Sequence, residues 1–216
     1  MSSFLPDIPF FCIHLERAKE REAFMIHFQN TMGRPIQTWA ASEGSTIAKL
    51  GWSRKHPIEQ ITSDGALGCL DSHLRLLQDM LDKNYEVIGI FEDDAEITSS
   101  ISDLQTFYTE ATLLEPKWDI LVLGANEWVD FTKINKTIVK PTRFWGTHAF
   151  LITKEAASKY IETHQKLQAK GYAYPADWLY FKTIQDNNLT VYGPTNPKLI
   201  RQKPGLVSAI NGKVRT

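Results

Sequence analysis

The sequence predicts an α/β fold in which helices cover a parallel or mixed central sheet. Residues 87–91 form a short run of β-branched and aromatic side chains, and residues 118–124 form a second, largely apolar run. Such runs are typical of strands buried on both faces, which occur in sheets that carry helices on both sides. From residue 67 to residue 81, leucine instead recurs every three or four positions, which predicts a helix with one buried face.

The composition predicts a folded chain with a sizeable core. Of the 216 residues, 43% are hydrophobic and 11% aromatic, so we expect one domain that spans residues 1–216. Basic and acidic residues nearly balance, 24 against 25, and the formal net charge is -1. A chain without an overall positive field does not attract polyanions as a whole, which argues against a nucleic-acid partner.

The sequence carries no signal for membrane insertion or secretion. No apolar run approaches the roughly 18 residues of a membrane-spanning helix, and the first residues lack a basic segment followed by an apolar stretch. We therefore expect a soluble, cytoplasmic protein, free or peripheral to a membrane, with no transmembrane segment. Cys12 and Cys69 are the only cysteines, and in a reducing compartment two buried thiols are favoured over one disulfide.

The first elements along the chain are a strand and a charged helix. Residues 9–15 predict the strand, and residues 17–24 predict an amphipathic helix with its charges on the outer face. Arg17 and Arg21 would lie one helical turn apart, and two forked guanidinium groups could bind a phosphate or a nucleotide together. The alternative is a solvated face on which neighbouring glutamates pair with both arginines.

A second strand follows at residues 36–41, and residues 42–45 predict the loop at its end. In a strand-helix-strand unit this loop lies beside the loop that follows the first strand. Ser42 or Glu43 could therefore contact a ribose or a base edge.

The leucine-repeat helix covers residues 65–81, and Ser63 or Asp64 can cap it. Gly65 and Gly68 are unfavourable inside a helix unless another group approaches closely. A pyrophosphate or a sugar at the helix N-terminus is one such group, and close packing against a strand is the other explanation.

Two polar residues, Ser72 and His73, follow on the same helix. Both are candidates for contact with a ligand. His73 could act as a catalytic base, but beside an apolar stripe it could equally be a hydrogen-bonded structural histidine.

The apolar strand at residues 87–91 ends abruptly in three carboxylates, Glu92, Asp93 and Asp94. Ligands of such sheets bind outside the carboxyl ends of the strands, which is where this turn lies. Adjacent acids repel one another unless a cation offsets them, and carboxylate oxygens suit Mg²⁺ or Mn²⁺, with substrate phosphates completing the shell. A solvated acidic turn is the alternative.

The remaining segments predict further helices and strands. Helices are predicted at residues 101–114 and at residues 154–161, the second capped by Thr153, and strands at residues 118–124, 144–152 and 191–194. Residues 197–202 predict a basic tail that can lie over an anionic ligand. Residues 133–139 fit either a strand pair or a loop. Asp177 lies at the start of another predicted helix, where spacing alone indicates an N-terminal cap.

Two linked runs carry a resemblance to a known family. They are Gly65-Ala66-Leu67-Gly68-Cys69-Leu70-Asp71-Ser72-His73 and Ile88-Gly89-Ile90-Phe91-Glu92-Asp93-Asp94-Ala95. Both resemble the signatures of glycosyltransferase family 25, the lipooligosaccharide and procollagen galactosyltransferase-like enzymes. The resemblance extends to residues 13–17 with Arg21, to residues 119–124, to residues 146–152, and to Asp177 and Gln202. It therefore covers nearly the whole chain, in the right order.

The resemblance implies a GT-A-type nucleotide-sugar transferase fold with a mixed, mostly parallel central sheet flanked by helices. It divides a single glycosyltransferase domain into a nucleotide-binding part, about residues 1–125, and an acceptor-side part, about residues 126–216. It implies a Mn²⁺ or Mg²⁺ cofactor held by Asp94 and Glu92. Together with the residue patterns, it gives this donor-binding set: Arg17, Arg21, Ser42, Glu43, Gly65, Ser72, His73 and Asp93.

The implied reaction moves a hexose, galactose or glucose, from a nucleotide-diphosphate sugar, a UDP-sugar, to a hydroxyl of a glycan or protein-linked acceptor. The family typically inverts the anomeric centre, so one carboxylate should deprotonate the acceptor hydroxyl. Asp177 is the first candidate for this base and Glu127 the second. The alternative function is a non-catalytic nucleotide- or sugar-binding module of the same fold, against which the intact acidic turn and Asp177 argue.

Overall fold

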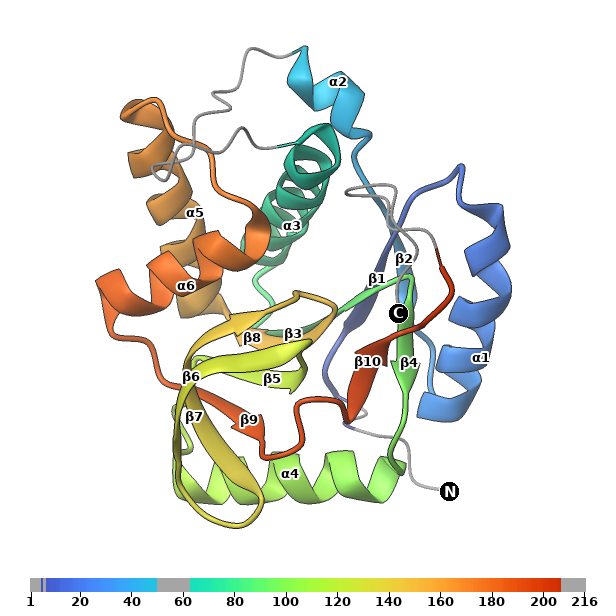
Figure 1. Cartoon of the computed structure of the whole chain (residues 1–216), viewed down its shortest axis with the longest axis vertical. Coiled ribbons are helices and arrows are strands. Elements are labelled where there is room, and N and C mark those ends of the chain that lie inside the picture. Colours follow the sequence, from blue (N-terminus) through green and yellow to red (C-terminus); the bar gives the residue numbers. More distant parts are fainter. Residues whose placement is uncertain (1–4, 6, 50–62, 207–216) are drawn as a thin grey trace.

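The central feature of the fold is a twisted sheet with helices on both faces. The computed structural model describes residue 5, residues 7–49 and residues 63–206 (Figure 1). Within these residues eight strands form one sheet in the order β2-β1-β3-β8-β5-β9-β7-β6. They are β1 (Phe10–His14), β2 (Gln37–Ala40), β3 (Val87–Glu92), β5 (Ile120–Gly124), β6 (Glu127–Lys133), β7 (Ile138–Trp145), β8 (Ala149–Thr153) and β9 (Val191–Pro194). A separate ribbon pairs β4 (Ala95–Ile97) with β10 (Ile200–Gln202).

The strand directions confirm the prediction of a mixed sheet. β1 pairs in parallel with β2 and β3, and β5 pairs in parallel with β9. β8 is antiparallel to β3 and β5, and β7 is antiparallel to β9 and β6. Of the eight described strands, β7 and β8 are therefore antiparallel to the other six. Because both lie inside the sheet, four of the seven neighbouring pairs are antiparallel.

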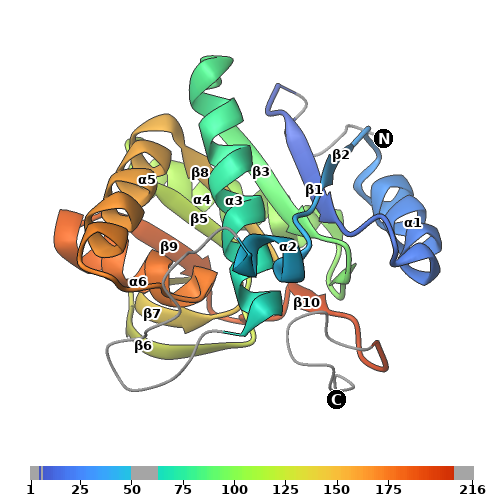
Figure 2. The same cartoon turned by 90° about the horizontal axis from the view of Figure 1, so that it is seen from above.

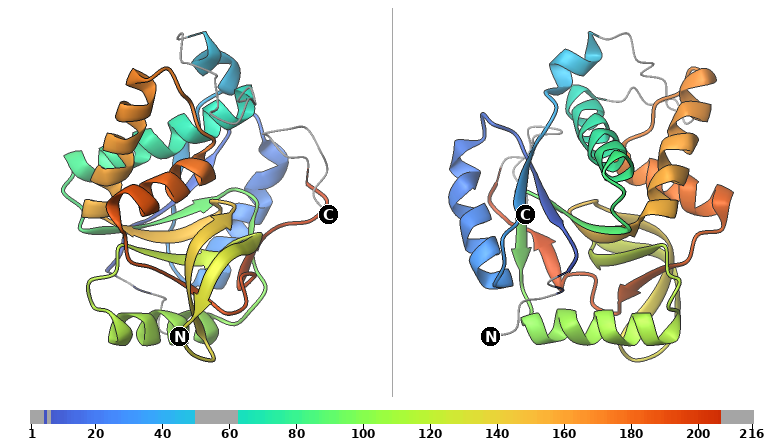
Figure 3. Two further views of the ribbon diagram at one scale, coloured as in Figure 1. Left: turned by 60° about the vertical axis from the view of Figure 1, so that its left-hand side comes forward. Right: turned by 180° about the vertical axis from the view of Figure 1, so that it is seen from behind.

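Helices cover the two faces unequally. They are α1 (Glu22–Met32), α2 (Gly44–Ala48), α3 (Asp64–Asp82), α4 (Ile101–Leu114), α5 (Lys154–Ala169) and α6 (Ala176–Asn187). α3, α5 and α6 pack on one face of the sheet, while α1 and α4 pack on the other (Figure 3). From above, α3 lies between α5 and α6 on one side and β1, β2 and α1 on the other (Figure 2).

Side-chain alternation along the strands explains why β3 has no polar side chain before Glu92, its last residue. Ile88 and Ile90 pack in the cluster beneath α3, α5 and α6, whereas Phe91 packs in the cluster that contains α1 and α4. The residues of β5 divide between the same two clusters. Because a strand presents successive side chains to opposite faces, burial of both faces requires an apolar residue at every position.

The prediction of a helix at residues 17–24 is wrong about where the helix begins. Residues Lys19–Arg21 form a single 3-10 turn, α1 begins at Glu22, and Arg17 precedes both elements. The two arginines therefore do not share a helical face. The predicted loop at residues 42–45 is also shorter than expected, because α2 begins at Gly44.

The predicted strand at residues 144–152 is two strands. β7 ends at Trp145 and β8 begins at Ala149, and Gly146 between them has a φ of 93°, a conformation that glycine adopts without a steric penalty. Residues 133–139, for which the sequence allowed two interpretations, form the end of β6, the turn and the start of β7 in a hairpin.

Several smaller predictions are confirmed. The Ser63 hydroxyl accepts a hydrogen bond from the Ala66 N–H and caps α3, and Thr153 caps α5 in the same way. Cys12 and Cys69 are free thiols. Among the described residues, no helix combines the length and the hydropathy that crossing a bilayer requires.

Candidate active site

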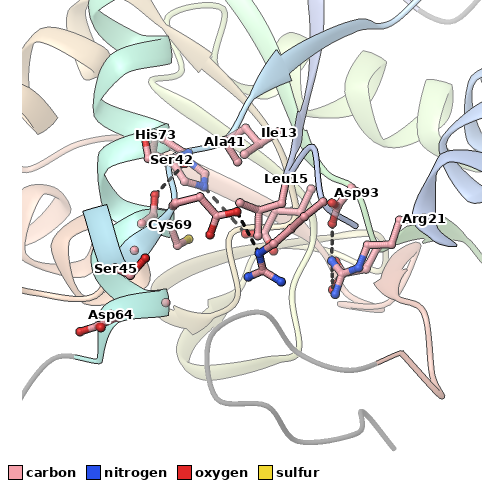
Figure 4. Close-up of a pocket in the computed structure, with 18 residues that line it drawn as sticks. Ile13, Leu15, Arg21, Ala41, Ser42, Ser45, Asp64, Cys69, His73 and Asp93 are labelled. Atoms are coloured by element: carbon pink, nitrogen blue, oxygen red, sulfur yellow. Dashed lines mark hydrogen bonds and ion pairs between the residues drawn. The ribbon is translucent and has the colours of Figure 1, made fainter. Parts of the chain in front are cut away.

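A cavity of about 260 Å³ opens where β1, β2 and β3 end beside the N-terminal half of α3 (Figure 4). Ten predicted residues line it: Arg17, Arg21, Ser42, Glu43, Gly65, Ser72, His73, Glu92, Asp93 and Asp94. They come from four segments that are distant in the sequence. The parallel pairing of the three strands brings these segments together, because it places their carboxyl ends at one edge of the sheet.

The acidic turn, which consists of Glu92, Asp93 and Asp94, is fixed by backbone hydrogen bonds on both sides. Glu92 is the last residue of β3, and the Asp93 N–H donates to the carbonyl of Ile13 at the end of β1 (3.1 Å). The carbonyl of Asp94 accepts from the Lys203 N–H (2.7 Å) just after β10. The three carboxylates are therefore attached to a clamped segment rather than to a free loop.

Arg21 offsets part of the negative charge of this turn. Its guanidinium, only 5% exposed, donates to Asp93 and lies 3.7 Å from Asp94. Burial alone would lower the pKa of Arg21, but the charge of Asp93 and the hydrogen bond to it outweigh burial and raise the pKa. His14 Nδ1 lies 2.9 Å from the second oxygen of Asp93. Asp93 is thus held by two neighbours, and Arg21 points to the acids rather than into open solvent (Figure 4).

Arg17 and the loop after β2 form the opposite rim of the cavity. Arg17 Nε donates to Glu43 (2.8 Å), and both side chains are largely exposed. The Ser42 N–H donates to the Ser72 hydroxyl (2.8 Å), which itself donates to the Gly68 carbonyl (2.6 Å). Ser72 therefore ties the loop to α3.

Gly68 allows α3 to approach this loop closely. A Cβ atom at position 68 would lie 2.6 Å from the carbonyl oxygen of Ser42 and 2.8 Å from the backbone nitrogen of Gly44. Both distances are far shorter than real Cβ contacts. The structure supports close packing at Gly68, although the partner is the loop after β2 rather than the strand that the sequence analysis named.

Glu92 occupies the centre of the cavity wall. Its carboxylate accepts from the Thr147 hydroxyl (2.7 Å) and from Gln202 Nε2 (3.2 Å), and His73 Nε2 lies 3.8 Å from Oε1. Burial would raise the pKa of Glu92, but the His73 imidazole and the Thr147 hydroxyl outweigh it and lower the pKa to about 2. Glu92 is therefore ionised throughout the physiological range.

Asp177 lies outside the residues that line the cavity, near the start of α6. The helix N-cap is Pro175, so the predicted capping role is not the observed one, and Asp177 Oδ1 instead accepts from the Trp178 N–H (2.9 Å). Burial raises the pKa of Asp177, and the nearby charge of Glu92 adds to the rise, while backbone hydrogen bonds oppose it. Asp177 is thus electrostatically coupled to the cavity.

Glu127 is exposed at the start of β6, opposite Trp145 in the β6–β7 ladder. Between Glu127 and α6 lies an aromatic cluster, in which the Trp145 and Trp178 ring centres are 5.4 Å apart. The Arg143 guanidinium lies 4.6 Å and 4.7 Å from these two rings. The structure therefore does not bring Glu127 or Asp177 into the ten-residue cavity, but it places Asp177 beside aromatic rings.

Three residues of the site region were missed as site candidates by the sequence reasoning. His14 holds Asp93, Thr147 holds Glu92, and Cys69 lines the cavity beside His73. Cys69 lies four residues before His73 on a predicted helix, so the helical repeat could have indicated that they share a face. Thr147 follows the break after β7, and no local pattern signals its contact with Glu92.

The donor atoms of the turn fit a hard divalent cation. Glu92, Asp93 and Asp94 carry three carboxylates, and Arg21 offsets one negative charge, so this wall of the cavity keeps a negative balance. Asp93 is engaged by Arg21 and His14, and Glu92 by Thr147 and Gln202, while all three acids carry the carboxylate oxygens that Mn²⁺ or Mg²⁺ prefers.

Comparison with known proteins decides the family. The family model described as glycosyltransferase family 25 (LPS biosynthesis protein) matches residues 7–180, which include the cavity residues and Asp177. The chain belongs to glycosyltransferase family 25. This family 25 chain is therefore a glycosyltransferase, with the α/β fold and the mixed central sheet that the sequence predicts.

Individual relatives are more distant. The lacto-N-neotetraose biosynthesis glycosyltransferase LgtE of Neisseria meningitidis serogroup B is 25% identical over 88% of this family 25 chain and 72% of its own length. The lipooligosaccharide biosynthesis protein lex-1 of Haemophilus influenzae is 26% identical over 68% of this chain and 53% of its own length.

Two solved structures are also similar. One is a glycosyltransferase involved in the glycosylation of the major capsid of PBCV-1, with a TM-score of 0.43 and 14% identity over 85% of this chain and 77% of that chain. The other is CMP:2-keto-3-deoxy-manno-octonic acid synthetase, with a TM-score of 0.43 and 11% identity over 87% of this chain and 89% of that chain.

Proposed function

We propose that this glycosyltransferase moves a hexose, galactose or glucose, from a UDP-sugar to a glycan or glycoprotein acceptor hydroxyl, with metal assistance and inversion of the anomeric centre. The observation that carries the proposal is the cavity at the ends of β1, β2 and β3, where ten predicted donor and metal residues meet. The names of the relatives favour a lipooligosaccharide glycan as the acceptor.

On the donor side, the side chains of this chain bind and orient the nucleotide-sugar. Glu92 and Asp94 would hold the Mn²⁺ or Mg²⁺ ion, and Arg21 holds Asp93 in place beside them. When bound, the ion offsets the negative charge that develops on the leaving diphosphate. Arg17, exposed on the rim and paired with the exposed side chain of Glu43, can turn toward a phosphate.

On the acceptor side, Asp177 takes the proton of the attacking hydroxyl. Burial and the charge of Glu92 raise its pKa, which strengthens the carboxylate as a base near neutral pH. The rings of Trp145 and Trp178 next to it offer flat apolar surfaces on which a sugar ring can stack. Glu127 is the alternative base, and its exposure to solvent at the start of β6 makes it the weaker candidate.

The test is a calorimetric titration of UDP- and GDP-sugars with and without Mn²⁺, followed by incubation with a lipooligosaccharide acceptor and analysis of the product linkage. We expect one UDP-hexose to bind in a metal-dependent way and to give a product of inverted configuration. Retention of configuration would remove Asp177 from its role as the base.

Two other outcomes contradict larger parts of the proposal. If a nucleotide-sugar binds but no transfer occurs to any glycan acceptor, the chain acts as a binding module. If no nucleotide-sugar binds with or without Mn²⁺, the donor assignment of the cavity is wrong.

A further inference from the structure

Three potential metal ligands meet at the base of the cavity, and two of them have no part in the manganese site proposed above. Cys69 and His73 lie one turn apart on α3, and Glu92 lies at the end of β3 opposite them. One ligand atom from each residue lies within 4.8 Å of the other two. Figure 4 shows Cys69 and His73 extending from α3 toward the cavity.

The buried ring nitrogens of His73 require a hydrogen-bond or metal partner. Its side chain is fully buried, and neither ring nitrogen has a hydrogen-bond partner among the described residues. The separation of 3.8 Å from His73 Nε2 to Glu92 Oε1 is too long for a hydrogen bond. Buried polar atoms are almost always paired, because leaving one unpaired costs free energy. An imidazole nitrogen that faces a carboxylate and a thiol across such a gap is suited to bind a cation between them.

We propose that Cys69 Sγ, His73 Nε2 and Glu92 Oε1 bind one transition-metal ion of the zinc class, without any nucleotide. A thiolate, an imidazole and a carboxylate are a ligand set that Zn²⁺ accepts and that Mg²⁺ does not prefer. Three protein ligands leave a fourth tetrahedral position open toward the cavity. On binding, the Cys69 thiol releases its proton to solvent and the sulfur donates an electron pair to the metal.

The surroundings of Glu92 support a built site. Thr147 and Gln202 donate to its two carboxylate oxygens and fix the plane of the group. His73 stacks on Phe150, with ring centres 5.9 Å apart, and this fixes the imidazole. Such outer contacts orient metal ligands before the metal arrives. The inference goes beyond the proposed function, because it requires neither a donor sugar nor Asp94.

The experiment uses Co²⁺ as a spectroscopic substitute for Zn²⁺ on the metal-free chain, without nucleotide. A thiolate bound to Co²⁺ gives a near-ultraviolet charge-transfer band. We expect the band in the wild-type chain and in Cys12→Ser, the matched control, because Cys12 lies outside this cavity. We expect no band in Cys69→Ser. In His73→Gln, competition with a chelator should show Zn²⁺ bound about 100-fold more weakly.

X-ray absorption on the zinc-loaded wild-type chain keeps the proposal testable even if a variant fails to fold. We expect one sulfur ligand at about 2.3 Å together with nitrogen and oxygen ligands. A zinc shell without sulfur, or a cobalt band of equal strength in Cys69→Ser, would overturn the proposal. Asp94→Asn should keep the cobalt band while losing Mn²⁺-dependent donor binding, so the two metal assignments can fail separately.

Discussion

The two sides of the molecule present their functional residues in different ways. On the donor side, the ends of three parallel strands bring ten residues into one cavity. On the proposed acceptor side, which comprises the β6–β7 hairpin and the start of α6, Asp177 lies on a half-buried helix end and Glu127 on an exposed strand, and neither lines the cavity. Parallel strands aim their loops at one edge, whereas an antiparallel hairpin spreads its residues along its length.

The largest expected effect tests whether the donor side depends on the acidic turn. Asp94→Asn should reduce transfer by about three orders of magnitude or more and abolish Mn²⁺-dependent donor binding, because it removes an oxygen ligand of the metal. Calorimetry and a transfer assay measure both. The matched control is Glu96→Gln, since Glu96 pairs with Arg201 and Lys203 outside the cavity. If Asp94→Asn binds the donor in the presence of Mn²⁺ as tightly as Glu96→Gln does, Asp94 is not a ligand of the metal ion.

The second prediction separates the two carboxylates of the acceptor side. Asp177→Asn should lower kcat by about two orders of magnitude while leaving donor affinity unchanged, because an amide cannot accept the acceptor proton. Glu127→Gln should stay close to the wild-type rate. Steady-state kinetics with both variants tests the assignment, and the reverse pattern would make Glu127 the base.

The third prediction concerns the close contact that shapes the donor side. Gly68→Ala should lower the free energy of unfolding by about 2 kcal/mol, because its Cβ would clash with the backbone of Ser42 and Gly44. Gly68→Ala should also weaken donor binding, because the clash moves the loop of Ser42 and Glu43, which lines the cavity.

A second glycine provides the control for that clash. At Gly33, which ends α1 with a φ of 67°, a Cβ meets nothing within 4 Å. Gly33→Ala should therefore cost about 1 kcal/mol from backbone strain alone and leave donor binding unchanged. Urea denaturation and calorimetry compare the two variants, and equal loss of donor binding would show that position 68 has no special role in the cavity.

The smallest effect compares the pH dependence of two carboxylates whose pKa values shift in opposite directions. The folded pKa of Glu92, about 2, lies below its ordinary value, so its contribution to stability is complete above about pH 4.3 and is lost as the pH falls toward 2. The folded pKa of Asp177 is raised, so ionisation of Asp177 reduces stability as the pH rises through that pKa.

Variants of Glu92 and Asp177 test the directions of these two pH-dependent changes in stability. Glu92→Gln should be less stable than the wild type at pH 7, with the difference shrinking in acid, whereas Asp177→Asn should be slightly more stable at pH 7. Thermal unfolding between pH 3 and pH 7 measures both differences. A stabilising Glu92→Gln at neutral pH would show that burial, rather than its hydrogen bonds, controls this carboxylate.

The sequence predicts the strands and the helix around the cavity well because their signals are local. The burial of β3 on both faces excludes polar side chains before Glu92, and Ser63 and the leucine repeat define the start and the buried face of α3. Parallel pairing places the end of β3, with Glu92, at one edge of the sheet, and His73 reaches the same cavity from α3. These features depend on residues that are close in the sequence.

The features that the sequence does not predict depend on distant contacts. Arg21 is buried where it pairs with Asp93, which lies 72 positions away in the sequence. A local helix pattern therefore cannot show that Arg21 is buried. In the β6–β7 hairpin, the register shifts between Trp128 and Asp130 interrupt the two-residue period that marks a strand. β6 is also largely exposed and lacks an apolar face.

The pairing of β4 with β10 has a consequence for the order in which the enzyme assembles. Residues 200–203 clamp the acidic turn through the β ribbon, the Lys203 N–H and the Gln202 side chain. A ribosome makes the chain from its N-terminus, so the carboxylates emerge more than a hundred residues before the strand that fixes them. The nascent protein therefore carries its acids without this C-terminal clamp while about half of its residues are added, and the acidic turn takes its final shape only after residues 200–203 have been made.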